Sequence, residues 1–188
     1  MKAVLLSLKP QYCELIASGK KTVEIRKTRP KIDTPFKVYI YQSKDNWVYK
    51  ILKKLGLYQQ KVIGEFVCDK IYAVLSHPTI FAGYPLFHQK AIESACLTCD
   101  EVEKYSNGKD VLGWHISDLK IYDKPIELSE FYNVCSEWEK ERITNKCHKC
   151  PHLFKNDSDM CYQCSIEGER HIKRPPQSWC YVEELEGN

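Results

Sequence analysis

Short stretches of alternating apolar and polar residues constrain the fold of this chain most. Residues 2–8 show the pattern clearly, because Val4, Leu6 and Leu8 fall on one side of an extended segment. Five further segments have the composition or alternation of strands: 22–27, 36–42, 61–75, 113–128 and 177–185. No strand–helix–strand alternation runs through the chain, so a mixed or antiparallel sheet is expected, curled into a small β-barrel.

Local signals predict where several elements begin and end. Pro10 suits the first position of a helix, and Gly19 suits its C-terminal end. Residues 47–58 and 129–143 also have helical spacing, whereas residues 76–97 show no clear pattern. A capping box of Thr98 and Glu101 predicts a helix that ends near Gly108. Residues 61–75 are expected to form one long strand, with a break or bend as the alternative, and Gly64 suggests a bulge in it. Asp123–Pro125 suggests a turn within 113–128.

The length and composition indicate one folded domain. The chain has 188 residues, of which 43% are hydrophobic, and we expect a single α+β domain over 1–188. No apolar run reaches the roughly 20 residues that span a bilayer. The N-terminal apolar stretch is too short for a signal peptide, so no membrane partner and a cytoplasmic location are expected. The oligomeric state is not predicted.

Four cysteines form two closely spaced pairs: Cys147, Cys150, Cys161 and Cys164. Each CxxC pair presents two thiolates from a tight turn, and two such pairs complete the tetrahedral shell of a structural zinc ion. Such a site has no open position for substrate. The sequence therefore predicts an inserted four-cysteine zinc module at 144–166, with two disulfides or four unligated thiols as the alternatives.

Cys96 and Cys99 form a third CxxC beside an expected helix start. A redox pair is one interpretation. No thioredoxin-like strand–helix–strand context surrounds them, so two ordinary thiols are the other.

The charge of the chain is unevenly distributed. Residues 1–61 contain 14 Lys and Arg but only 4 Asp and Glu, although the formal net charge of the whole chain is +3. A basic portion on a nearly neutral protein is typical of an anionic partner, with nucleic acid first and a membrane surface second. The alternative is a solvated, lysine-rich surface.

Three segments resemble a known family. They are LLSLKPQYCELIASGKKTVEIRK at residues 5–27, GWHISDLKIYDKPIELSEF at 113–131 and PPQSWCYVEEL at 175–185. Together they resemble ASCH (activating-signal-cointegrator homology) domains of the PUA-like superfamily. Residues 44–60, expected to be helical, and 144–166 look like insertions into that pattern.

The resemblance implies a PUA-like small β-barrel with flanking helices and a cleft between the first helix and the barrel. RNA binding is the usual proposal for the family. Some members are amidohydrolases that deacetylate N4-acetylcytidine, and others are described as ribonucleases. The amidohydrolase element reads G-x-K-T-x-T-x-R, with the lysine and the second threonine in the active site. Lys21 matches that lysine, but Glu24 stands where the second threonine would be.

The residues themselves support a binding cleft. Lys9 and Lys21 lie at expected loop edges, from which an ammonium group can reach a phosphate. Arg26 shares a strand face with Glu24, and it can pair with that carboxylate or bind a phosphate or base edge. The candidate nucleic-acid-binding or nucleotide-binding residues are Lys9, Lys20, Lys21, Arg26, Trp114, Ser178 and Trp179. The tryptophans are interpreted as stacking surfaces or as core, and His115 as a proton-transfer group or a structural histidine.

We therefore expect the protein to bind RNA or a modified nucleoside or nucleotide in a basic cleft. One alternative is an amidohydrolase of the N4-acetylcytidine type, or a ribonuclease, that uses Lys21 and Glu24 as catalytic residues. A second alternative is a zinc-containing protein-interaction module.

Overall fold

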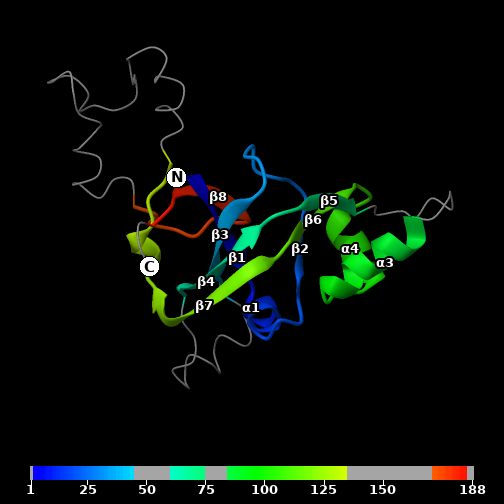
Figure 1. Cartoon of the computed structure of the whole chain (residues 1–188), viewed down its shortest axis with the longest axis horizontal. Helices are drawn as coiled ribbons and strands as arrows, with labels where there is room; N and C mark the ends of the chain where they lie inside the picture. Colours follow the sequence, from blue (N-terminus) through cyan, green and yellow to red (C-terminus); the bar gives the residue numbers. More distant parts are fainter. Residues whose placement is uncertain (1, 45–59, 75–83, 135–170, 186–188) are drawn as a thin grey trace, which may run out of the picture.

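The computed structural model describes residues 2–44, 60–74, 84–134 and 171–185 (Figure 1). The elements in these ranges are β1 (Lys2–Leu8), α1 (Pro10–Ala17), β2 (Val23–Arg26), β3 (Phe36–Gln42), β4 (Val62–Cys68), β5 (Ile71–Val74), α3 (Tyr84–Ser94), α4 (Cys99–Ser106), β6 (Val111–His115), β7 (Ser117–Ile126), the 3₁₀ turn η1 (Leu128–Glu130) and β8 (Trp179–Glu183). Of the helices placed there, none has the length and apolar character needed to cross a bilayer.

The strands form two sheets. The larger has five strands in the order β7-β4-β3-β1-β8, and the smaller has three in the order β2-β6-β5. Strands β1 and β3 are parallel, whereas the other pairs are antiparallel. Figure 1 shows α1 beside the central strands and the α3–α4 pair beside the three-stranded sheet.

The expected β-barrel is wrong. Among the described residues, β7 and β8 are the edges of the larger sheet and do not pair with each other, and β2 and β5 are the edges of the smaller sheet. Only Ile116 separates β6 from β7, so one extended segment passes from the smaller sheet to the larger. Two open sheets joined in this way give a mixed α+β fold without a closed barrel.

The inserted zinc module receives no support from the structure. In the ranges given above, no group of three or more His, Cys, Asp or Glu side chains could hold a metal ion. Cys147, Cys150, Cys161 and Cys164 lie outside those ranges, so zinc as a cofactor rests on their spacing alone. Most of the helical insertion expected at 44–60 also lies outside the described residues.

Two expected strands differ from those observed. The alternative of a broken strand holds for 61–75: the break falls at Asp69–Lys70, and the halves β4 and β5 belong to different sheets. No turn divides 113–128 into two strands at Asp123–Pro125: β7 continues to Ile126, although its pairing with β4 shifts register between Ile121 and Ile126. Of the helix expected at 129–143, the described residues 129–134 contain the end of the 3₁₀ turn η1 and isolated bridges at Tyr132 and Asn133, and residues 135–143 lie outside the described part of the chain.

The core has three layers. One cluster lies between the two sheets and α1, and includes Val4, Leu6, Val38, Ile16 and Trp114. A second lies on the other face of the five-stranded sheet around Leu5, Tyr39 and Phe131. A third joins the three-stranded sheet to α3 and α4 through Ile25, Ile92 and Val102. The three-stranded sheet is therefore covered on both faces, and polar residues of β2 are held inside the molecule.

Candidate functional site

The turn after α1 sets the start of β2. The Gly19 N–H donates to Ile16 O (2.8 Å), and Gly19 has a φ of +71°, a left-handed conformation that favours glycine. The Lys21 N–H then donates to Leu15 O (2.9 Å). These bonds turn the chain directly into β2 and place Lys21, Glu24 and Arg26 together.

Lys21 is buried rather than exposed at a loop edge, with a relative exposure of 2%. Its Nζ donates a hydrogen bond to Ala95 O (2.7 Å) and lies 3.3 Å from Glu24 Oε2. The Tyr12 ring lies nearby, with its centroid 5.3 Å from Nζ. The ammonium group therefore joins α1, β2 and the connection between α3 and α4.

Glu24 is the carboxylate between two buried cations. Its Oε2 faces Lys21, and its Oε1 lies 3.0 Å from Arg26 Nε. The Nε–H of Arg26 is not aligned for a hydrogen bond, so this contact is an ion pair, and Nε has no hydrogen-bond partner in the described part of the chain. Two cations and one carboxylate leave the cluster with a net positive charge.

Arg26 connects the two sheets. Its Nη2 donates to the carbonyl oxygen of Ser7 on β1 (2.9 Å), and its Nη1 donates to Ser178 Oγ (3.3 Å), just before β8. Ser178 is half-buried, so its contact is the edge of the cluster nearest solvent. The Ser178 oxygen accepts from Arg26, and its own hydroxyl hydrogen can donate to another group.

The two candidate tryptophans differ in exposure. Trp114 is fully buried and lies opposite Glu24 in the β2–β6 pairing. Its Nε1 has no hydrogen-bond partner among the described residues. Trp179 is half-buried, with its ring centroid 6.0 Å from that of Trp114 at an interplanar angle of 56°. Trp114 is thus a core residue, and Trp179 presents part of its ring to solvent.

The remaining basic candidates lie outside the buried cluster. Lys9 is the exposed N-cap residue of α1, and Lys20 is exposed in the turn before β2. The structure therefore brings Lys21, Glu24, Arg26 and Ser178 into one connected set, with Trp114 and Trp179 beside it. Lys9 and Lys20 belong to the surrounding surface.

The Glu24 carboxylate also affects a nearby thiol on α1. Burial raises the pKa of Cys13 to about 12, and the negative charge of Glu24 adds to that increase. Cys13 is therefore a protonated core residue at neutral pH and is unsuited to act as a nucleophile.

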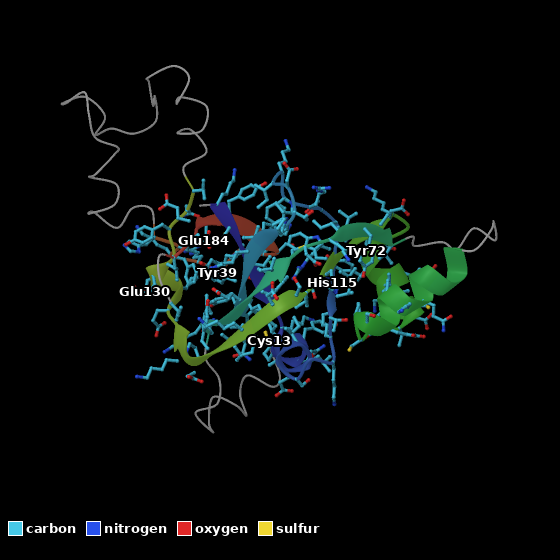
Figure 2. All side chains as sticks on the ribbon, in the orientation of Figure 1. Cys13, Tyr39, Tyr72, His115, Glu130 and Glu184 are labelled. Atoms are coloured by element: carbon cyan, nitrogen blue, oxygen red, sulfur yellow. The ribbon has the colours of Figure 1, made fainter. Side chains whose placement is uncertain are left out.

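His115 forms a separate polar pair. Its Nδ1 lies 2.6 Å from Asp69 Oδ1, and the hydrogen bond lowers the pKa of that carboxyl group below its ordinary value. Figure 2 shows His115 and Tyr72 toward the α3–α4 side of the molecule, away from Tyr39 and Glu184. Because Trp114 faces the layer between the sheets, the adjacent His115 faces the other side of β6.

An open pocket of about 430 Å³ lies elsewhere, against the segment before β8. Its lining includes His171, Lys173, Arg174 and Cys180. Cys180 packs with the second core cluster, on the face of the large sheet away from Trp114. We give more weight to the Lys21–Glu24–Arg26 cluster as a functional site, because its charges are buried and linked to one another.

Sequence reasoning missed two partners of the site and the partner of His115. Ala95 and the Ser7 carbonyl contribute backbone oxygens, which leave no signal in residue type. Asp69 is 46 residues from His115, and only the pairing of β5 with β6 places the ends of these strands together.

The family profile described as ASCH domain matches residues 6–145 of the chain. The crystal structure of ASCH from Zymomonas mobilis aligns with a TM-score of 0.55 at 17% identity, covering 97% of this chain and 88% of that one. A single-residue variant of that protein aligns with a TM-score of 0.54 at 19% identity, covering 98% and 92%. At these identities the likeness concerns the fold. No curated protein matches the chain.

Proposed function

Because this chain belongs to the ASCH domain family, we propose that it binds RNA or a modified nucleoside or nucleotide beside Arg26 and Ser178. ASCH domains have a PUA-like fold and are commonly RNA-binding. The family match agrees with the resemblance seen in the sequence. The site and the ligand are our proposal.

The observation that carries this proposal is the incompletely partnered cluster around Arg26. A buried guanidinium normally has its N–H groups matched by acceptors. Here Nε is matched only by the Glu24 carboxylate at 3.0 Å, without an aligned hydrogen bond, and Nη1 at the half-buried edge makes a 3.3 Å contact, longer than the roughly 2.7–2.9 Å typical of charge-assisted bonds. A phosphate or a base carbonyl could supply a better acceptor at the Ser178 edge.

The cluster favours an anionic or acceptor-rich ligand. Glu24 is one carboxylate against two cations, so the cluster keeps one net positive charge. The free hydroxyl hydrogen of Ser178 adds a neutral donor at the same edge. Exposed Lys9 and Lys20 belong to the basic N-terminal third, which attracts polyanions over a longer range.

The proposal is tested by titrating single-stranded RNA and modified nucleosides into the wild type, Arg26→Lys and Ser178→Ala. Lysine keeps the charge but loses the planar fork, so we expect Arg26→Lys to weaken binding by about tenfold or more. Ser178→Ala removes one neutral donor, and we expect a loss of about 2- to 10-fold. Thermal unfolding of each variant controls for stability.

Two results would contradict the proposal. The first is the absence of binding by the wild type to any RNA or nucleoside tested. The second is binding that neither substitution changes while both variants remain folded.

A second candidate function is hydrolysis of a nucleoside amide or of RNA by Lys21 and Glu24. It is favoured by the 3.3 Å contact between an ammonium and a carboxylate, two groups able to transfer protons. An ammonium that contacts a carboxylate suits an acid or a charge-stabilising group better than a nucleophile. Turnover of N4-acetylcytidine or RNA by the wild type, absent from a folded Lys21→Met variant, would support this function over simple binding.

A further inference from the structure

A basic loop directly follows the strand that carries Arg26. Residues 27–31 read KTRPK, and Lys27, Arg29 and Lys31 are exposed. Lys27 lies over the Tyr105 ring on α4, at 5.0 Å from its centroid, so it is turned toward the helices. In the described part of the chain, no ion pair neutralises Arg29 or Lys31, and Asp33 is the nearest acidic residue that follows.

This loop is fixed against aromatic residues of β8. Trp179 Nε1 donates to Thr28 Oγ1 (3.2 Å), and the backbone N–H of Lys31 donates to Tyr181 Oη (2.6 Å). Pro30, between them, is buried. The two contacts hold the loop against β8, with Thr28 at the Trp179 indole and the Lys31 backbone at the Tyr181 hydroxyl, and Arg29 lies between these two contacts in the chain.

The β8 rings extend away from the buried cluster. Trp179 and Tyr181 are both half-buried, with ring centroids 5.4 Å apart at 75°. The Trp114 and Tyr181 rings both meet the Trp179 indole at an angle, so neither ring is stacked in parallel on the face of that indole. Lys2 Nζ lies 4.2 Å from the Tyr181 centroid, and Lys2 is opposite Glu183 in the β1–β8 pairing.

We propose that the loop 28–31 and the rings of Trp179 and Tyr181 form an extended binding surface for single-stranded RNA, continuous with the Arg26–Ser178 edge. An unpaired base stacks on Trp179, and the flanking phosphates contact Arg29 and Lys31. Interleaved cations and aromatic rings suit a single strand, because its bases are free to stack, whereas a duplex keeps its bases paired inside. This inference rests on the proposed function and specifies its ligand as a polymer.

The test compares three ligands: a single-stranded RNA of about ten nucleotides, the same sequence as a duplex, and a mononucleotide. Affinity is measured over a range of salt concentrations for the wild type, Arg29→Ala/Lys31→Ala and Trp179→Leu. A matched control, Lys104→Ala/Lys109→Ala, removes the same charge from exposed positions on or near α4.

We expect Arg29→Ala/Lys31→Ala to weaken binding of the single strand and to reduce its log–log salt slope by about 1.4, the value for two lost phosphate contacts. The control pair should change this slope much less, and affinity for the mononucleotide should be preserved. Trp179→Leu should weaken the single strand by about 5- to 150-fold, the range for loss of one stacked base. Because Trp179 also touches the core residue Trp114, the loop variant decides the outcome if this one misfolds.

Three results would overturn the inference. The first is an equal loss of single-strand affinity in the control pair. The second is duplex binding that is as tight as single-strand binding and responds in the same way to Arg29→Ala/Lys31→Ala. The third is single-strand binding that this loop variant leaves unchanged. In the third case, a loss of RNA or nucleoside affinity in Arg26→Lys would still support the proposed function. Absence of RNA and nucleoside binding by the wild type would reject both.

Discussion

Glu24 contacts both buried cations of the cluster, so its own substitution has a structural cost. Removing one partner of a buried ion pair typically costs about 3–5 kcal/mol, because the remaining charge is left uncompensated. We expect Glu24→Gln to lower the free energy of unfolding by about this amount, since Lys21 and Arg26 both lose their carboxylate. Lys21→Met should cost less, because Glu24 keeps Arg26.

Urea denaturation followed by circular dichroism measures these differences. Glu14→Gln on α1 is the matched control, because Glu14 is exposed. If Glu24→Gln and Glu14→Gln had the same stability, the ion-pair contacts would not stabilise the fold. The comparison also matters for function, because loss of activity in Glu24→Gln has to be separated from loss of the folded protein.

The pair of Asp69 and His115 predicts a dependence of stability on pH. The hydrogen bond from His115 lowers the pKa of Asp69 from its ordinary value of 3.8. A carboxyl group whose pKa is lower in the folded state than in the unfolded state stabilises the fold at pH values above its unfolded-state pKa. That contribution is lost as the pH falls through its folded-state pKa. We therefore expect Asp69→Asn to be less stable than the wild type at pH 6, with the difference shrinking as pH falls below about 4.

Urea denaturation of both proteins over a pH series tests this prediction. Asparagine can still accept a neutral hydrogen bond from His115, so the difference isolates the carboxylate charge. A stability difference that stays constant from neutral pH to well below 4 would show that the charge of Asp69 does not contribute.

At the scale of elements, Gly64 permits the close approach of β4 and β7. A Cβ at this position would lie 2.4 Å from the backbone oxygen of Lys120 and 3.1 Å from Ile121 Cα. Backbone atoms cannot move aside as a flexible side chain can. We expect Gly64→Ala to destabilise the protein by about 1–3 kcal/mol, as overpacking does in other cores.

Thermal and urea unfolding of Gly64→Ala measure that loss. Gly108→Ala is an informative comparison, because Gly108 has a φ of +75° but a Cβ added there would have no atom within 4 Å. The Gly108 variant reports backbone strain alone, and the Gly64 variant reports steric conflict. Wild-type stability in Gly64→Ala would mean that the two strands separate without cost.

Elements with local signals could be predicted from the sequence. Pro10 begins α1, Gly19 follows its end with a positive φ, and Thr98 with Glu101 forms the capping box of α4. The bulge expected at Gly64 is also confirmed by the register shift between β3 and β4. Each of these features depends on residues that are close in sequence.

Boundaries set by distant partners could not be predicted. The break at Asp69–Lys70 separates strands of different sheets, and the passage at Ile116 joins them, which alternation alone does not reveal. The expected barrel failed for the same reason, because closure depends on which edge strands pair. Helix α3 falls in the segment without a clear pattern, and its Ile92 packs in the third core cluster with residues of β2.

The candidate site was predictable in part. Alternation along β2 placed Glu24 and Arg26 on one face, where the structure has them in contact. It did not reveal the burial of Lys21, whose hydrogen-bond partner Ala95 is 74 residues away. Nor did it distinguish the core residue Trp114 from the half-buried Trp179, because exposure depends on how the two sheets meet.

For the whole molecule, the junction of the two sheets is the central feature. The sheets are joined by the β6–β7 segment and by Arg26, which reaches from β2 to the Ser7 carbonyl and to Ser178. The proposed site lies where these elements meet. A ligand bound at this site would contact both sheets, so we expect binding to stabilise the folded protein.

Ultraviolet crosslinking of single-stranded RNA to the wild-type protein, with the crosslinked peptides mapped by mass spectrometry, tests the central proposal most directly. We predict crosslinks within residues 26–31 or 178–181, the segments that carry Arg26, Ser178 and Trp179. Crosslinks confined to other parts of the chain, such as the pocket at 171–174, would contradict binding at the Arg26–Ser178 edge.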